Sequence, residues 1–234
     1  MSGSMTAAHP GIRLNARDLA ALSRIVEGRV ATLETVQLYL YVHDRDAGCL
    51  EGKRTLRSVR YVVNRWVRAG LVTTERNPFG GNTLVVAQKP AMELVDAPTG
   101  MRAGLPSMGI LRHSVAVQRV GAELMVRGYE WTHEVRLPWN DGHRPDGCAN
   151  RLEENFAVEV DLTRKQRDRW IAIAHSNVAR YNFVAYHTTH NLAPTLQRWV
   201  ADAHLHHVCR VFTLPSHISL EAPSRRGGEN PHAE

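Results

Sequence analysis

The chain has 234 residues, 43% of them hydrophobic and 22% charged, and its formal net charge of +6 comes almost entirely from arginine. This composition excludes global disorder, and no stretch has membrane-spanning length, so we expect a globular protein that is not inserted in a membrane. The excess of arginine favours a polyanionic partner, because guanidinium groups form forked hydrogen bonds with phosphates, although codon usage in a GC-rich genome also raises arginine content.

The first region, residues 11–90, predicts three helices followed by a β-hairpin. Asn15 is a favourable cap for a helix over ARDLAALSRIVEG, and Thr32 is one for a second helix over LETVQLYLY. A third helix over RTLRSVRYVVNRWVRAG ends at Gly70, and the turn NPFGG then joins the strands LVTTER and NTLVVAQK. This order is typical of a winged helix-turn-helix, so we expect a DNA-binding domain here.

The third helix has a basic face opposite its apolar face. Leu56, Val59, Val63 and Trp66 follow helical steps and are expected to face the core. The other face and the hairpin supply the residues expected to contact double-stranded DNA. These candidates are Arg54, Arg57, Ser58, Tyr61, Arg65 and Arg68 on the helix, with Arg76 and Lys89 at the hairpin. A solvated arginine face on a protein–protein module is the alternative.

Three further segments follow along the chain. Residues 91–108 are rich in proline and glycine and have no clear period, which predicts a linker. Residues 109–215 alternate helices and strands in the order α-β-β-β-α-β-α-β, which predicts an α/β sheet with helices on both faces. Residues 216–234 are polar and rich in glycine and proline, so we expect a disordered tail.

An acidic stretch in the second region carries the main functional signal. The turn RPDG, which contains Asp146, precedes the strand NFAVEVDL, in which Glu159 and Asp161 project to the side opposite the apolar residues. If these two strands are neighbours, Asp146 lies opposite Glu159 and we expect their carboxylates to converge. Converging carboxylates suit Mg²⁺, or Mn²⁺ as its substitute, which activates water for phosphodiester hydrolysis. Alternatively, the turn is purely conformational and Asp161 or Thr163 caps the next helix.

At these residues the sequence resembles known families. Asp146, twelve residues and then Glu159-Val160-Asp161, on an α-β-β-β-α-β frame, resemble the PD-(D/E)XK nuclease superfamily. Together with the winged helix, the segments LRHSV, WTHEVRL, RPDG and VEVDLTRK resemble the replication-relaxation family of plasmids and mobile elements, over most of residues 15–213. The family resemblance implies that the chain acts on DNA in replication initiation, relaxation or transfer.

The superfamily resemblance also implies roles for individual residues. By this resemblance Asp146 and Glu159 would bind the metal. Asp161 is expected as a third ligand because it projects to the same side of the strand as Glu159. The lysine that usually stands two residues after the glutamate is replaced by Asp161, so Lys165, four residues further on, is expected near the scissile phosphate. This departure makes the motif degenerate and leaves open whether the chain is a Mg²⁺-dependent endonuclease or nickase. Glu134 and His113 are additional candidates for the same pocket.

The alternative function is that of a non-catalytic DNA-binding regulator, whose nuclease-like domain serves dimerisation or partner binding. Tyr39 and Tyr41 are expected to pack the winged helix rather than to act as nicking nucleophiles. Cys49, Cys148 and Cys209 are isolated in the sequence, which indicates a reduced, cytoplasmic protein without a disulfide framework. Neither the recognised DNA sequence nor the presence of a homodimer follows from the sequence.

Overall fold

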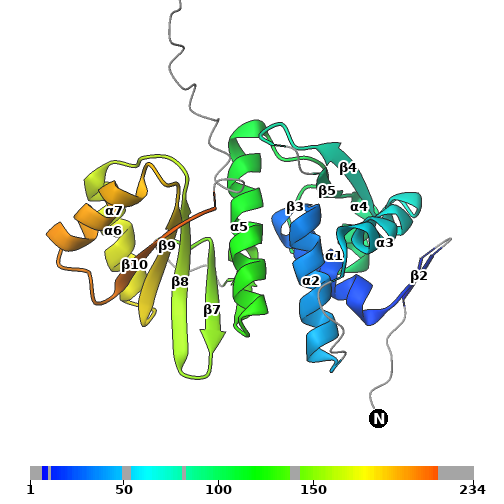
Figure 1. Ribbon diagram of the computed structural model, residues 1–234, viewed down its shortest axis with the longest axis horizontal. Coiled ribbons are helices and arrows are strands. Elements are labelled where there is room, and N and C mark those ends of the chain that lie inside the picture. The colour runs from blue at the N-terminus through cyan, green and yellow to red at the C-terminus, as the bar shows by residue number, and fades with distance from the viewer. Residues whose placement is uncertain (1–6, 10–11, 49–53, 81–82, 138–142, 216–234) are drawn as a thin grey trace, which may run out of the picture.

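The protein, described by a computed structural model, is mixed α/β. A long helix, α5 (Met108–Val126), stands at its centre, with a helical region on one side and a five-stranded sheet on the other (Figure 1). None of the described helices is both long and apolar enough to cross a lipid bilayer. The predicted tail, 216–234, lies outside the described residues. The described residues are 7–9, 12–48, 54–80, 83–137 and 143–215.

The N-terminal region consists of three helices and a small antiparallel sheet with the strand order β3-β5-β4, preceded by a short hairpin of β1 and β2. As predicted, the side chains of Asn15 and Thr32 accept hydrogen bonds from backbone N–H groups three residues later and cap α1 and α2. The elements are β1 (Ala7–His9), β2 (Ile12–Leu14), α1 (Ala16–Gly28), β3 (Val30–Thr32), α2 (Leu33–Asp46), α3 (Leu56–Arg68), β4 (Val72–Arg76) and β5 (Thr83–Ala87).

The predicted inward face of α3 is confirmed. Val59, Val63 and Trp66 are buried in the N-terminal core, and Leu56 packs against that core from a half-buried position. Thr55 caps the helix by accepting a hydrogen bond from the Ser58 backbone N–H. Each fully buried side chain of this size contributes about 1.5–3 kcal/mol through removal of apolar surface from water. The burial of this face leaves the opposite face of α3 directed outward.

The segment predicted as a linker is packed onto the N-terminal core. It begins with α4 (Lys89–Leu94), and the residues from Met92 to Met101 supply apolar side chains to the same core. Further along, the Gly104 N–H donates to the Ala87 carbonyl at 2.9 Å, and the Arg29 guanidinium donates to the Gly104 carbonyl at 3.2 Å. The chain therefore reaches α5 without leaving the surface of the N-terminal region.

Helix α5 packs against both halves of the molecule. Leu111 and Val115 form one apolar cluster with Val30, Leu84 and Val86 of the small sheet, whereas residues on another side of α5 contact the large sheet. Gly28 brings α1 close to α5, since a Cβ atom there would lie 2.0 Å from the Gln118 side chain. The two predicted domains are thus joined through a shared helix.

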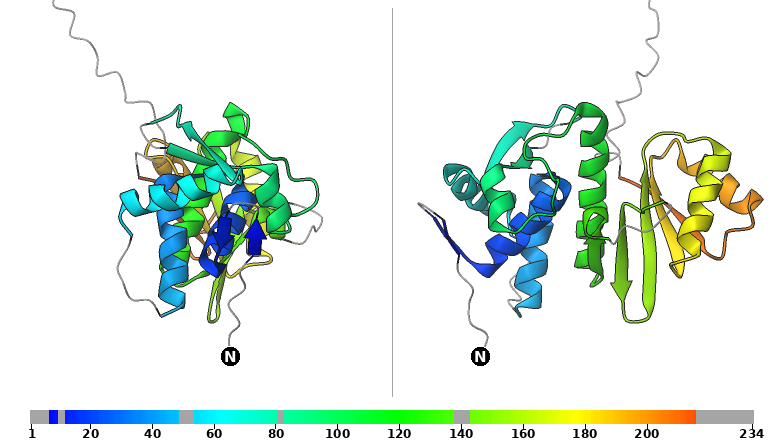
Figure 2. Two further views of the ribbon diagram at one scale, coloured as in Figure 1. Left: turned by 90° about the vertical axis from the view of Figure 1, so that its right-hand side faces the viewer. Right: turned by 180° about the vertical axis from the view of Figure 1, so that it is seen from behind.

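The large sheet has the strand order β10-β9-β8-β7-β6, in which β6, β7 and β8 are antiparallel and β8, β9 and β10 are parallel. Helix α5 covers one face, and α6 and α7 cover the other (Figures 1 and 2). The predicted order of elements is confirmed, but the first strand is shorter than predicted because Glu134–Arg136 form a 3-10 turn. The elements are β6 (Glu130–His133), β7 (Gly147–Arg151), β8 (Glu154–Asp161), α6 (Arg167–Val178), β9 (Phe183–Thr188), α7 (Ala193–Asp202) and β10 (Cys209–Thr213).

Strand β8 has the predicted alternation of faces. Phe156, Val158 and Val160 pack in the core beneath α5, whereas Ala157 packs with Trp170 of α6 in the core on the opposite face. Because successive side chains alternate, the odd-numbered residues of the strand share the α6 face. Glu159 and Asp161 are therefore held at the carboxyl end of β8 with their side chains buried.

Candidate functional site

The acidic residues meet at the carboxyl end of β8. Gly147, the first residue of β7, pairs with Val158, so Asp146 immediately before it comes opposite Glu159, as predicted for neighbouring strands. Asp161 is the last residue of β8 and pairs with Thr188 of β9, whose hydroxyl donates to the Asp161 carbonyl at 2.6 Å. The fold thus brings the three predicted metal-ligand candidates to one end of the sheet.

The Glu159 carboxylate is buried on the α6 face, with 2% of its side chain exposed. Its Oε1 atom accepts a hydrogen bond from the Asn177 side-chain amide at 2.7 Å and lies 2.7 Å from His143 Nε2. Burial raises the pKa of Glu159, the hydrogen bond with His143 opposes this, and the nearby charge of Asp146 raises the pKa further. Two neighbours therefore fix the orientation of a carboxylate that is costly to ionise.

The Asp146 carboxylate is oriented differently. It accepts a hydrogen bond from the Val160 backbone N–H at 2.7 Å and lies 3.2 Å from Nε2 of His113 on α5. The backbone N–H of a strand residue lies close to the plane of the sheet, and His113 approaches from α5, so this carboxylate is held at the end of β7 towards the α5 side. The prediction that Asp146 and Glu159 project together is therefore only partly correct: they share the strand end but are held from helices on opposite faces.

Position 147, next to Asp146, has room only for glycine, because the Trp131 indole lies against its Cα atom. A Cβ atom at this position would lie 2.2 Å from the ring and 2.9 Å from the Thr132 carbonyl oxygen. We expect Gly147→Ala to lower the free energy of unfolding by about 1–3 kcal/mol, measured by urea denaturation, because the ring must move within a packed core. In the control Gly109→Ala, the new methyl group has open space, and we expect no loss of stability. Equal stability of Gly147→Ala and the unchanged chain would contradict this assignment.

Asp161 forms an ion pair with Lys165 beneath α6. The Asp161 side chain is 2% exposed, and its second oxygen, Oδ2, is buried without a hydrogen-bond partner among the described residues. Helix α6 begins at Arg167, with Gln166 at the cap position and no side-chain cap bond. The alternative in which Asp161 or Thr163 caps this helix is therefore wrong, because the chain from 162 to 166 is not helical.

The Lys165–Asp161 pair should contribute measurably to stability. We expect Lys165→Met to lower the free energy of unfolding by about 3 kcal/mol, because it leaves the buried Asp161 carboxylate without its counter-charge. Lys89→Met removes a lysine whose ion pair with Glu93 is exposed, and it should change stability by less than about 1 kcal/mol. Urea denaturation of both variants at neutral pH tests this. Equal losses of unfolding free energy would show that the buried pair contributes no more to stability than the exposed pair.

Two further titratable residues surround Asp146, as expected for the additional candidates. Burial alone lowers the pKa of His113, but the hydrogen bond and charge of Asp146, with a contribution from Glu134, raise it above its ordinary value. Glu134 lies in the 3-10 turn, where burial and the Asp146 charge raise its pKa. The charges at this strand end thus influence one another.

His143 and Asn177 complete the surroundings of Glu159, and neither was predicted from the sequence. Asn177 lies on the inward side of α6, four residues after Ile173. A polar residue on an otherwise apolar helix face indicates a buried hydrogen-bond partner, and this was the signal in the sequence that could have identified it. His143 belongs to a non-repetitive segment before β7, where periodicity gives no information. Their positions follow from tertiary packing alone.

The chemistry of these residues fits a hard divalent cation, although the side chains are not already gathered around one point. No three of the described His, Cys, Asp and Glu residues converge closely enough to form a ready ligand set. However, Asp161 Oδ2 and Asn177 Oδ1 are buried oxygens without hydrogen-bond partners among the described residues, and they lie on the same face as the Glu159 carboxylate. Carboxylate and amide oxygens are the ligands that Mg²⁺ and Ca²⁺ prefer.

The outer face of α3 presents the second set of predicted residues. Arg57, Tyr61 and Arg68 are exposed, Tyr61 to 69%, and have no ion pair within the described part of the chain. Arg60, which was not among the predicted residues, shares this exposed surface three residues after Arg57, as helical spacing allows. Arg76, at the end of β4, is exposed beyond the helix. The outward basic surface of the helix, called here the α3 surface, consists of Arg57, Arg60, Tyr61 and Arg68.

Two arginines of the predicted DNA-binding set are engaged within the protein. Arg54 lies just before α3 rather than on it, and it donates to Asp44 Oδ2 of α2 at 2.9 Å, which ties the start of α3 to α2. Arg65 donates to Asp18 Oδ2 at 3.1 Å and to the Arg13 carbonyl at 3.2 Å, which ties α3 to α1. Both residues therefore help to position the helix.

The two remaining predicted DNA contacts also have partners inside the protein. The Ser58 hydroxyl donates to the Thr55 carbonyl at 2.8 Å within the helix cap. Lys89 is exposed and forms a surface ion pair with Glu93 at 3.5 Å. Of the two, only Lys89 has a side chain long and exposed enough to reach a phosphate.

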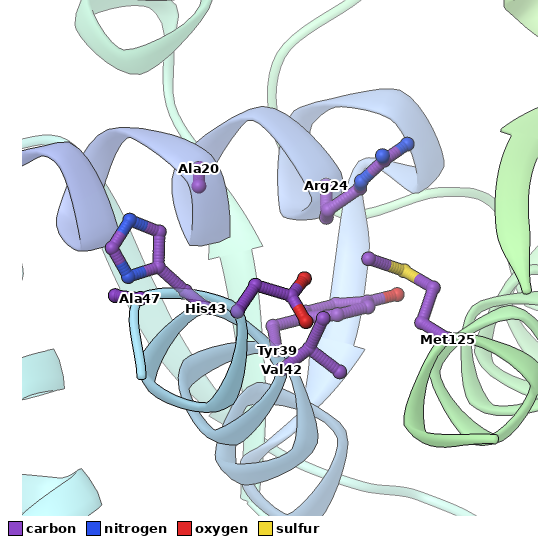
Figure 3. A pocket seen from close by; sticks show the side chains of 8 residues that line it. Ala20, Arg24, Tyr39, Val42, His43, Ala47 and Met125 are labelled. Atoms are coloured by element: carbon purple, nitrogen blue, oxygen red, sulfur yellow. The ribbon is translucent and has the colours of Figure 1, made fainter. Parts of the chain in front are cut away.

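A cavity of 360 Å³ lies between α1, α2 and α5 (Figure 3). Tyr39, on its wall, is buried and donates from its hydroxyl to the Gln118 carbonyl at 3.0 Å. Burial raises the pKa of Tyr39 far above its ordinary value, which keeps the hydroxyl protonated. The expectation that Tyr39 packs the N-terminal region is confirmed, and its burial disfavours a role as a nucleophile.

Comparison of the chain with protein-family models, with curated proteins and with solved structures finds no match. Two features of the molecule bear on its function. One is the buried carboxylate group at the end of β8, and the other is the exposed arginine surface of α3.

Proposed function

We propose that the chain is a DNA-binding protein in which a winged helix-turn-helix docks on duplex DNA and a PD-(D/E)XK nuclease-like domain acts beside it. The observation that carries this proposal is the α3 surface, where three exposed arginines have no carboxylate partner among the described residues. A helix of 13 residues is about 20 Å long and fits the major groove of B-form DNA. The hairpin of β4 and β5 follows directly, with Arg76 available to a flanking phosphate.

The nuclease-like assignment is supported by the order of elements in the large sheet and by the acidic residues of β8. Glu159 is oriented by His143 and Asn177, and the Lys165 ammonium group forms an ion pair with Asp161. If Mg²⁺ or Mn²⁺ is bound, Glu159 and Asp161 would hold it together with Asp146, whose carboxylate would have to turn away from His113. The ion would supply charge stabilisation and an activated water for phosphodiester hydrolysis. Lys165 would then be placed to stabilise negative charge on the phosphate.

The resemblance to the replication-relaxation family extends the proposal to a biological setting. The chain would act on plasmid or mobile-element DNA in the cytoplasm, in replication initiation, relaxation or transfer. Duplex DNA is the partner that the α3 surface supports. This setting rests on the segments LRHSV, WTHEVRL, RPDG and VEVDLTRK alone.

A non-catalytic DNA-binding regulator is the second candidate, and one specific observation favours it. Each carboxylate already has a donor or cation inside the protein: His113 for Asp146, His143 and Asn177 for Glu159, and Lys165 for Asp161. A pocket whose charges are balanced in this way is stable without a metal. In such a protein the sheet would serve as a scaffold for dimerisation or for a partner.

A plasmid assay separates the two candidates. The full chain is incubated with supercoiled plasmid in Mg²⁺, in Mn²⁺ and in EDTA, and gel shifts of a linear duplex are recorded in parallel. Conversion to open circles in metal but not in EDTA supports the nuclease. Intact plasmid together with a retained gel shift supports the regulator, and the absence of both contradicts the DNA-binding proposal.

A further inference from the structure

Part of the large sheet on the α5 side forms an open groove. Helix α5 packs over β6, β7 and β8, while its C-terminal end borders a pocket of 420 Å³ that extends over β9 and β10. Phe183 and His187 of β9 and Arg210 and Phe212 of β10 line this pocket, because alternate residues of the paired parallel strands share one face. We call this pocket the β9–β10 groove.

The walls of the groove are made of flat rings. Phe156 and Phe183 are stacked, with ring centroids 4.3 Å apart and an interplanar angle of 16°. His187 and Phe212 form a second stacked pair, 5.2 Å apart at 21°, and Phe212 is 41% exposed. Tyr129 meets the Phe156 ring edge-on at 5.3 Å. Exposed aromatic rings on a sheet are platforms on which further flat groups stack.

The groove also carries positive charge without matching negative charge. The Arg210 guanidinium lies 5.1 Å from the Phe183 ring centroid, and Arg127 lines the groove at the end of α5. Neither arginine has an ion pair within the described residues. Among the described residues that line the groove, Glu123 alone is acidic, and it is already paired with Arg119 at 2.7 Å. The site therefore favours a ligand that combines negative charge with flat apolar faces.

We propose that the β9–β10 groove binds single-stranded nucleic acid, with nucleobases stacking on Phe212 and its neighbours and phosphates contacting Arg127 and Arg210. Bases in a duplex are already stacked on one another, so a duplex does not offer the faces that these rings require. An apolar peptide would leave the two guanidinium groups without partners. Thr213 of β10 also lines the groove and pairs with Thr188 of β9, which in turn pairs with Asp161 of β8.

This inference goes beyond the proposed function, because it concerns neither the α3 surface nor the carboxylates. A strand separated from a duplex at the carboxyl end of β8 would reach this groove by passing to the α5 face of the sheet. The site would then hold the displaced strand, while the duplex remains on the N-terminal region. The test therefore uses single-stranded DNA, whereas the proposed partner of the α3 surface is duplex DNA.

The experiment measures binding of a fluorescein-labelled 12-nucleotide oligothymidine to the full chain by anisotropy, with a 12-base-pair duplex in parallel. We expect Phe212→Ala to weaken binding of the single strand by about 5- to 100-fold, because a stacking contact is lost. Arg210→Ala should weaken it and flatten its salt dependence. Arg198→Ala, an exposed arginine on the opposite face, should bind like the unchanged chain, and so should Phe212→Trp.

Several outcomes overturn the proposal. One is undetectable binding of the single strand by the unchanged chain, and another is unchanged affinity in both Phe212→Ala and Arg210→Ala. A third is an altered sedimentation coefficient of Phe212→Ala without altered oligonucleotide affinity, which would make the groove an interface between copies. Loss of duplex binding in α3 variants with retained single-strand binding would leave this proposal standing, so the two proposals fail separately.

Discussion

Replacing Arg57, Arg60 and Arg68 together with alanine is expected to lower the affinity for duplex DNA by about 100-fold at roughly 0.15 M salt. Each guanidinium that contacts a phosphate displaces condensed counterions, and the gain grows as salt falls. The slope of log affinity against log salt should therefore decrease by about 2.7 for the three contacts together. Because all three side chains are exposed and unpaired within the described residues, the fold should be unaffected.

The matched control removes the same charge elsewhere. Arg102, Arg151 and Arg198 are exposed and lie outside α3, so their combined replacement by alanine lowers the net charge equally. Anisotropy titrations across a salt series should show nearly unchanged affinity for this variant. Equal losses in the two triple variants would mean that DNA responds only to overall charge, and the α3 assignment would then be wrong.

Asp146→Asn and Glu159→Gln are each expected to lower metal-dependent nicking of supercoiled plasmid by about 100- to 1000-fold, the range seen when a charge-stabilising group is removed from an active site. Both substitutions keep the size of the side chain, and asparagine and glutamine retain an oxygen that accepts hydrogen bonds. What they remove is the negative charge that a divalent cation needs. DNA affinity should remain, since neither residue belongs to the α3 surface.

Glu154→Gln is the matched control for this prediction. Glu154 begins the same strand, β8, but its side chain is 51% exposed and lies at the opposite end from the acidic group. Nicking by this variant should equal that of the unchanged chain. Retained nicking in Asp146→Asn or Glu159→Gln, at normal metal concentration, would remove these carboxylates from the mechanism.

Local signals in the sequence were sufficient to predict most of the elements. The caps at Asn15 and Thr32 and the apolar stripe of α3 depend on interactions within a few residues, which is why they could be recognised. The role of α5 could not be recognised in the same way. Leu111 and Val115 face one core while Val117 and Val120 face another, and a single hydrophobic period does not reveal two separate partners.

For the candidate sites, the sequence predicted which strands are neighbours and which helix face each residue occupies, but not the partners of the side chains. Strand alternation correctly placed Glu159 and Asp161 on one face of β8. The direction of the Asp146 carboxylate depends on His113, 33 residues away in the chain, so the sequence pattern could not give it. The pairing of Arg65 with Asp18, 47 residues apart, likewise required the tertiary structure. Side-chain partners of this kind arise from packing between elements, which has no periodic signature.

Binding of Mn²⁺ to the full chain, followed by the loss of the free-ion electron paramagnetic resonance signal, tests the acidic site most directly. We expect the chain to take up one Mn²⁺, and we expect Asp146→Asn and Glu159→Gln to weaken this uptake while Glu154→Gln does not. An unchanged Mn²⁺ signal in the presence of excess folded protein would contradict this expectation, and the balanced ion pairs at the end of β8 would then be structural.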